Sequence, residues 1–141
     1  RMDLWVVSSV FTISCMFEAA FLFNQPLTSW DVSSVDSMIE TFHWASSFNQ
    51  PLNSWDVSSV DEMSGMFDGA SSFNQPIDSW DVSLVDDMSY MFRKASSFNQ
   101  PINSWNVSSI TDLGNIFDDM CDMFKEAVSF DKNNALWYDF N

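Results

Sequence analysis

One pair of polar residue types recurs along the chain at a fixed spacing and is the first candidate for a binding surface. An aspartate or asparagine is followed two residues later by a serine, and the pair returns every 25 residues. Stacked at ~4.8 Å, the spacing of neighbouring strands, adjacent carboxylates would repel by roughly 1 kcal/mol in water. Bonds to nearby serines and amides, bound cations such as calcium, or a basic partner surface would each relieve that repulsion. The candidate column comprises Asp31, Asp56, Asp81, Asn106, Ser33, Ser58, Ser83 and Ser108.

The other chemically reactive residues form no catalytic or metal-binding pattern. His43 has Asp68 and Arg93 at the equivalent repeat positions, so we expect it to face solvent, and no nucleophile recurs beside it. The chain has no zinc-ligand spacing and no Asp-x-Asp-x-Asp-Gly calcium loop. Cys15 and Cys121 lie in opposite end repeats, and we expect each to be a small buried hydrophobic residue. We therefore predict no enzyme activity, no metal site and no obligatory cofactor, with calcium left as an alternative.

Composition and charge exclude two classes of partner. The 141 residues carry five Lys+Arg against 20 Asp+Glu, a formal net charge of −15. Nucleic acids and anionic membrane surfaces attract basic proteins, so this charge argues against both. No apolar run reaches the ~20 residues of a membrane-spanning helix, so we predict that the chain is not transmembrane. Because 46% of the residues are hydrophobic, the chain can bury a core.

A repeat of 25 residues must position the column. A fixed period of this length is typical of a repeat solenoid, so we predict one array over residues 1–141. In the strand expected at its centre, Trp55 and Val57 point inward while Asp56 and Ser58 point to solvent, because strand side chains alternate. The repeats begin at Trp5, Trp30, Trp55, Trp80 and Trp105.

A second segment of each repeat predicts a helix. After a capping position at Asp61, apolar residues recur at i, i+3, i+4 and i+7, which indicates one buried helical face. That face consists of Met63, Met66, Phe67 and Ala70. The predicted fold is therefore an α/β repeat solenoid, leucine-rich-repeat-like, with one short parallel strand and one short helix per 25-residue coil.

The corners and ends of the array carry their own signals. Each corner combines asparagine, glutamine and proline, and we expect the stacked asparagines, and the glutamines beside them, to form a ladder that satisfies carbonyls of the turn. The end of the array diverges, with a lengthened helix at about residues 111–128 and a last strand near 137–140. At the other end, we expect the open strand edge to contact further repeats or a partner chain. The ladder asparagines are Asn24, Asn49, Asn74 and Asn99.

The repeated phrase also resembles a known family. Phe48-Asn49-Gln50-Pro51 and Trp55-Asp56-Val57-Ser58, at fixed spacing, are similar to the BspA-like leucine-rich-repeat surface proteins, a bacterial surface and lipoprotein repeat also found in mycoplasmas, algae and protists. The resemblance covers about Trp5 to Ser109. It implies a leucine-rich-repeat-like solenoid without catalytic activity, placed on the cell surface or secreted. It also implies a role in adhesion or protein binding.

Taken together, these patterns favour a non-enzymatic protein-binding or adhesion module of a surface or secreted protein, with other proteins as partners. One alternative is a structural accessory subunit of a larger multi-protein assembly, in an organelle or associated with a membrane. A second alternative is a calcium-stabilised solenoid. We expect the column and the open N-terminal edge to carry the contact with the partner protein.

Overall fold

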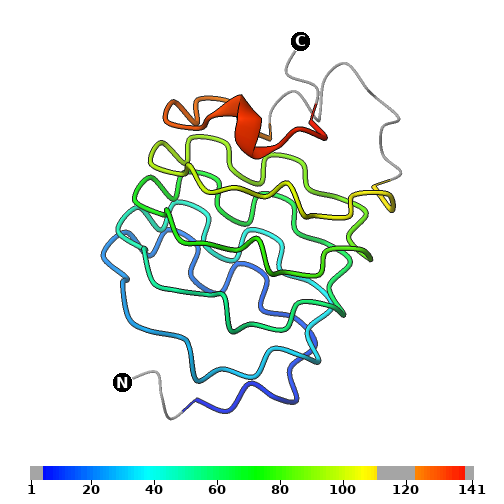
Figure 1. The fold of residues 1–141 in the computed structure, drawn as a ribbon. Helices are drawn as coiled ribbons and strands as arrows, with labels where there is room; N and C mark the ends of the chain where they lie inside the picture. The colour runs from blue at the N-terminus through cyan, green and yellow to red at the C-terminus, as the bar shows by residue number, and fades with distance from the viewer. Residues whose placement is uncertain (1–4, 111–122, 139–141) are drawn as a thin grey trace.

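The computed structural model describes residues 5–110 and 123–138. Each 25-residue repeat makes one turn of chain, called a coil below, and the coils lie one upon the next from the N-terminal to the C-terminal end (Figure 1). Residues 25 apart are therefore neighbours. Single parallel bridges join Thr12 to Ser37, Ser37 to Glu62 and Glu62 to Asp87.

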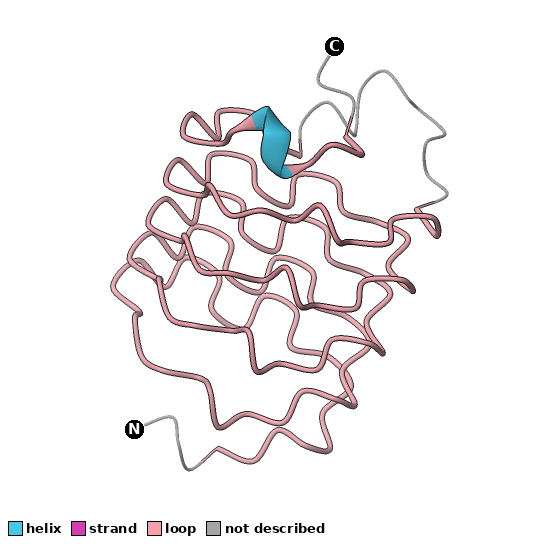
Figure 2. Cartoon of the chain, in the orientation of Figure 1, coloured by secondary structure: helices cyan, strands magenta, loops and turns pink. Residues whose placement is uncertain are grey.

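The predicted strand and helix of each coil are wrong. Within residues 5–110 and 123–138, the only regular element is a short 3-10 helix, η3 (Lys132–Asn134), and all other segments are turns or irregular chain, as Figure 2 shows. Because those residues contain no α-helix and no sheet, the fold is not the expected α/β, leucine-rich-repeat-like solenoid.

The predicted divergent end is corrected in the same way. Of the expected helix at about 111–128, residues 111–122 lie outside the described residues, and residues 123–126 form a turn. Of the expected strand near 137–140, Trp137 lies in a turn and Tyr138 in a bend, while the remaining positions fall outside the described part.

The segment predicted as a helix is a run of tight turns that also pairs with the next coil. In the second coil, the amides of Thr41, His43 and Ala45 donate to carbonyls three residues earlier, not four. The amides of Met38, Glu40, Phe42 and Trp44 instead donate to carbonyls of the next coil at 2.7–2.9 Å. Because alternate amides leave the coil in this way, an α-helical ladder cannot form.

Backbone conformation explains the same result. Glu40 and Trp44 have φ of 52° and 57°, and Gly65 and Gly69 have 60° and 70°. A positive φ at the third position is what a type II turn requires, and it interrupts a right-handed helix. At Gly69 space also matters, because an added Cβ would lie 2.8 Å from the ring of Trp44. Two successive turns therefore produce the i, i+3, i+4, i+7 spacing that predicted a helix.

The predicted inward-facing residues are confirmed although their secondary structure is not. Met63, Met66, Phe67 and Ala70 are all fully buried, and Trp55 is 3% exposed. Equivalent rings stack along the protein: Phe42, Phe67 and Phe92 have centroids 5.6 and 5.7 Å apart. The indole N–H groups of Trp55, Trp80 and Trp105 are also satisfied: each donates to a backbone carbonyl of the preceding coil at 3.1 Å.

The predicted asparagine ladder is present at the corner of the coils, but its asparagines accept from backbone amides and do not satisfy carbonyls as expected. Asn24 Oδ1 accepts from the amide of Asn49 at 2.9 Å and from Gln50 Nε2 at 3.0 Å. Asn49 Oδ1 receives the same two bonds from Asn74 and Gln75. The asparagines satisfy amides, whereas the glutamines reach carbonyls: Gln75 Nε2 lies 3.3 Å from the carbonyl of Asn49. The ladder therefore provides the partners that a backbone corner needs.

Candidate functional site

The predicted column is a row of closed turns, one in each coil. Asp31 Oδ1 accepts from the amide of Ser33 at 3.2 Å and from its hydroxyl at 2.6 Å. Asp56 and Ser58 make the same two bonds at 3.1 and 2.6 Å. The amides of Ser83 and Ser108 donate to Asp81 Oδ1 and Asn106 Oδ1 at 3.1 and 3.2 Å. These are Asx turns, so serine and amide bonding is the arrangement that the structure shows.

The turns also lower the pKa of two of the carboxyl groups in the column. Hydrogen bonds from Ser33 lower the pKa of Asp31, and the bond from the hydroxyl contributes more than the bond from the amide. The hydroxyl and amide of Ser83 lower the pKa of Asp81 in the same way. A lowered pKa keeps these carboxylates ionised further into acid than usual. The aspartates and Asn106 are exposed, so the surface presents three carboxylates and one amide at neutral pH.

A second polar cluster lies on the turn segments and was missed from the sequence. Glu18, His43, Asp68 and Arg93 occupy equivalent positions in four successive coils. Arg93 donates to Asp68 Oδ2 from Nη2 at 2.5 Å and from Nε at 3.0 Å. His43 Nε2 lies 3.5 Å from the same oxygen, and His43 Nδ1 lies 3.7 Å from Glu18 Oε1. The four side chains thus form a ladder of alternating acidic and basic groups.

The burial of this ladder corrects the expectation for His43. Its side chain is only 18% exposed, and its Nδ1 is buried without a hydrogen-bond partner among the described residues. Asp68 is more deeply buried, with a side chain 4% exposed. His43 is therefore held between two carboxylates of neighbouring coils and does not face solvent freely.

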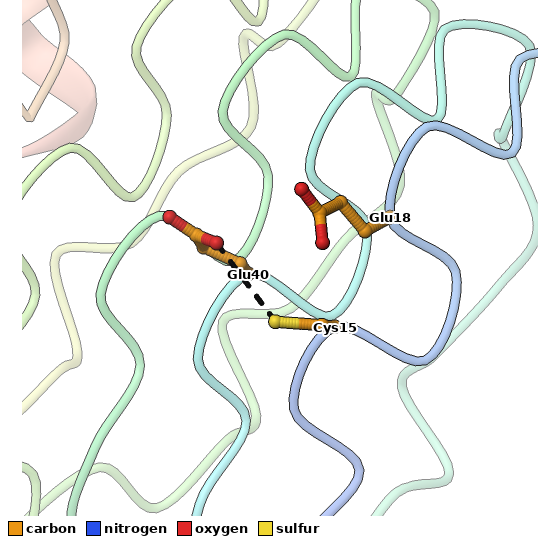
Figure 3. A group of neighbouring side chains, drawn as sticks. All are labelled: Cys15, Glu18 and Glu40. Carbon is orange, nitrogen blue, oxygen red and sulfur yellow. Dashed lines mark hydrogen bonds between the residues drawn. The ribbon is translucent and has the colours of Figure 1, made fainter.

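Cys15 and Glu40 extend the cluster at the N-terminal end (Figure 3). Cys15 Sγ donates to Glu40 Oε2 at 3.8 Å, and that oxygen lies 3.9 Å from His43 Nδ1. One sulfur or oxygen atom each of Cys15, Glu18 and Glu40 lies within 4.8 Å of the others. Cys15 is exposed, and it occupies the third position of a turn with a φ of 56°. The expectation of a buried Cys15 is wrong, and Cys121 lies outside the described residues.

The cluster was missed because no single repeat contains it. Positions 15 and 40 are equivalent, as are 18 and 43, so two coils each contribute two side chains. In the next coil the equivalents are Gly65 and Asp68. Comparing neighbouring repeats position by position, not searching one repeat for a motif, is the signal that would have found it.

The position of Cys15 predicts a slowly reacting thiol. Partial burial raises the pKa of the Cys15 thiol, and the carboxylates of Glu18 and Glu40 raise it further. Because the thiolate is the reactive form, we expect alkylation by iodoacetamide at pH 8 in metal-free buffer to be slower than that of free cysteine. Replacing Glu18 and Glu40 with glutamine removes two causes of the shift and should accelerate the reaction. Mass spectrometry of the Cys15 peptide gives the rates, and equal rates in both proteins would exclude the carboxylate effect.

The N-terminal coil exposes several large apolar side chains. Trp5 is 55% exposed, whereas Trp30 in the next coil is 4% exposed. Phe11 and Leu22 are 69% and 91% exposed. These side chains lie at the end for which we predicted an open edge. In the part of the chain that the structure describes, no helix has the length and apolar character that crossing a membrane requires.

Comparison with known proteins gives one match. A family model described as "Mycoplasma protein of unknown function, DUF285" matches the chain twice, over residues 1–81 and 53–140. The two matches together cover almost the entire sequence. No curated protein and no solved structure matches the chain.

Proposed function

We propose that this chain, which belongs to the DUF285 family of proteins of unknown function, is a non-enzymatic repeat module that binds another protein. The column of Asx turns is the observation that carries the proposal. The proposal also draws on the resemblance to BspA-like surface proteins. That resemblance favours a role in adhesion for a secreted or surface-anchored protein. Asp31, Asp56 and Asp81, with Asn106, are the residues that would contact the partner.

The geometry of the column suits binding. Each carboxylate is already held by the serine two residues later, so little side-chain freedom is lost when a partner arrives. The carboxylates recur once per coil and face solvent, so they match a partner surface that presents lysine or arginine at a similar spacing. The formal net charge of −15 would also accelerate the encounter with a basic partner.

Neutralising the column tests the proposal without breaking the turns. Asn106 already forms the turn with Ser108, so Asp31→Asn, Asp56→Asn and Asp81→Asn should together preserve the fold and remove three charges. If each exposed ion pair contributes about 0.5 kcal/mol, the triple variant should bind its partner about tenfold more weakly. Binding is measured on immobilised fibronectin, laminin and collagen, at low and at physiological salt.

The same three coils offer a matched control. Asp36, Asp61 and Asp86 are exposed, and their inter-coil bonds use backbone atoms, so replacing all three with asparagine changes the charge equally. This control should bind like the unmodified chain. Equal weakening by both triple variants would show that net charge, not the column, governs binding. Failure of the unmodified chain to bind any of the three proteins would argue against the adhesion role.

The exposed N-terminal coil favours a second candidate, a structural accessory subunit of a larger assembly. Exposed Phe11 and Leu22 would then be covered by a partner chain, because removing apolar side chains from water favours association. Under this role Phe11→Asp and Leu22→Asp should abolish assembly while the column variant assembles normally. The calcium-stabilised alternative gains no support from the column, since Asp31 and Asp56 already use one oxygen in two hydrogen bonds.

A further inference from the structure

We propose that Cys15, Glu18, Glu40 and His43 form a zinc-binding site between the first two coils; Figure 3 shows the first three of these side chains. Thiolate sulfur, imidazole nitrogen and carboxylate oxygen are the donors that Zn²⁺ takes in proteins, usually four in a tetrahedron. The mixed set also favours zinc over calcium and magnesium, which take oxygen donors. The proposal concerns a different surface from the Asx column and stands whether or not the column binds a protein.

The spacing of the donor atoms suits a tetrahedral ion. Glu18 Oε1 lies 3.7 Å from His43 Nδ1, Glu40 Oε2 lies 3.9 Å from the same nitrogen, and Cys15 Sγ lies 3.8 Å from Glu40 Oε2. Bonds of ~2.0 Å to nitrogen and oxygen and ~2.3 Å to sulfur place tetrahedral donors roughly 3.3–3.6 Å apart. Each of these three pairs needs to approach by only a few tenths of an ångström, and the donor atoms of Cys15, Glu18 and Glu40 all lie within 4.8 Å of one another. These side chains are partly exposed, so a metal ion can enter from solvent.

The buried nitrogen of His43 is the independent observation that points to a ligand. His43 Nε2 faces the carboxylate of Asp68 at 3.5 Å, so a proton on Nε2 is favoured there. Nδ1 then carries a lone pair that faces Glu18 and Glu40, and it has no hydrogen-bond partner among the described residues. A lone pair directed at two carboxylates is unfavourable, whereas a cation between the three groups satisfies all of them.

Asp68 supplies the support that metal-binding histidines commonly have. A histidine ligand usually donates its second N–H to a carboxylate, which fixes the ring and strengthens the donor nitrogen. Asp68 has a side chain only 4% exposed, and Arg93 holds it by two hydrogen bonds. Its other oxygen, Oδ1, has no partner in the described part of the chain. Asp68 is therefore a positioning residue for His43 and not a ligand itself.

Titration of the EDTA-treated chain with zinc chloride tests the site directly. We expect one Zn²⁺ per chain by calorimetry, with proton release because the thiol must ionise to bind. Co²⁺ should give a thiolate-to-metal absorption band in the near ultraviolet, which carboxylates alone do not produce. Both experiments use a Cys121→Ser background, so that Cys15 is the sole thiol. An absent binding heat together with an absent thiolate band would overturn the proposal.

Substitutions distinguish the proposed zinc ligands from Asp68, which only positions His43. Cys15→Ser and His43→Gln should each weaken zinc binding by more than the ~10- to 100-fold typical of losing a supporting residue, and Asp68→Asn should fall within that range. Glu126→Gln removes an exposed carboxylate from the C-terminal end and should leave zinc affinity unchanged. Unchanged affinity in Cys15→Ser and His43→Gln would place the metal elsewhere and overturn the proposal.

A second measurement avoids reliance on variants that fold poorly. In the Cys121→Ser background, stoichiometric Zn²⁺ should protect Cys15 from iodoacetamide, and EDTA should restore the reaction. Melting curves recorded in EDTA show which variants remain folded. If zinc gives no protection at concentrations that saturate the calorimetric signal, Cys15 is not a ligand and the site as proposed is wrong.

Discussion

Replacing Phe67 with alanine should lower the free energy of unfolding by about 3–5 kcal/mol, the usual range for a buried phenylalanine. The ring is fully buried and lies where two columns of rings meet. It stacks on Phe42 and Phe92 of the adjoining coils at 5.6 and 5.7 Å, and on Phe73 of its own corner at 4.0 Å. Its loss leaves a cavity in the middle of the stack, where the coils on both sides depend on it.

Urea unfolding followed by circular dichroism measures this effect. Phe21→Ala is the matched control, because the Phe21 side chain is 55% exposed and its truncation should change stability by no more than about 0.5 kcal/mol. If the two variants unfold at the same urea concentration, the phenylalanine columns do not hold the coils together. A single cooperative transition is required for the comparison.

Arg93→Met should lower stability by about 3–5 kcal/mol, because it leaves the buried Asp68 carboxylate without its charged partner. Asp68 has a side chain 4% exposed, and Arg93 Nε and Nη2 both donate to its Oδ2. His43 Nε2 is the remaining basic neighbour at 3.5 Å. An imidazole at that distance replaces neither hydrogen bond.

A double-mutant cycle distinguishes the buried charge from general packing. Adding Asp68→Leu to Arg93→Met removes the unpaired charge and should recover much of the lost stability. Lys94→Met is a control in the same coil: Lys94 Nζ lies 5.4 Å from the centre of the Trp44 ring, a contact worth roughly 0.5–1 kcal/mol at an exposed site. A double variant no more stable than Arg93→Met alone would contradict the explanation.

The sequence predicted those features that depend on which side chains lie in register. A 25-residue period places Trp55 beside Trp80 and Asn49 beside Asn74, whether the local backbone is a helix, a strand or a turn. The burial of Met66 and the hydrogen bonds of Asn49 follow from side-chain chemistry at those positions. The inward-facing set and the corner ladder were therefore predictable from the repeat.

The secondary structure could not be predicted from the same pattern, because two backbone conformations satisfy it. An apolar spacing of i, i+3, i+4 and i+7 fits a helix and also fits two successive turns with a positive φ at the third residue. Only Gly65 and Gly69 signal the second conformation, since their residue type adopts it readily. Glu40 and Trp44 take the same conformation without any signal in their residue type.

The two polar surfaces differed in how visible they were. The Asx column repeats in every coil, so its spacing identified it, and the bonds from Ser33 and Ser58 then showed the structural role of the aspartates. The Cys15 cluster is assembled from two unlike repeats and repeats nowhere else in the described residues. A search for repeated motifs therefore does not detect such a site.

The inter-coil hydrogen bonds also give the stack an electrical direction. The peptide unit between Thr41 and Phe42 accepts from Phe17 of the preceding coil and donates to Met66 of the following one, both at 2.9 Å. Three further peptide units of that coil point the same way. Each carries a dipole of about 3.5 D, and these add from coil to coil, whereas neighbouring units along a β-strand largely cancel. The N–H ends point toward the C-terminal coil. The stack therefore has a negative pole at its N-terminal end, where Cys15 and Glu18 lie and where a cation gains most from the field.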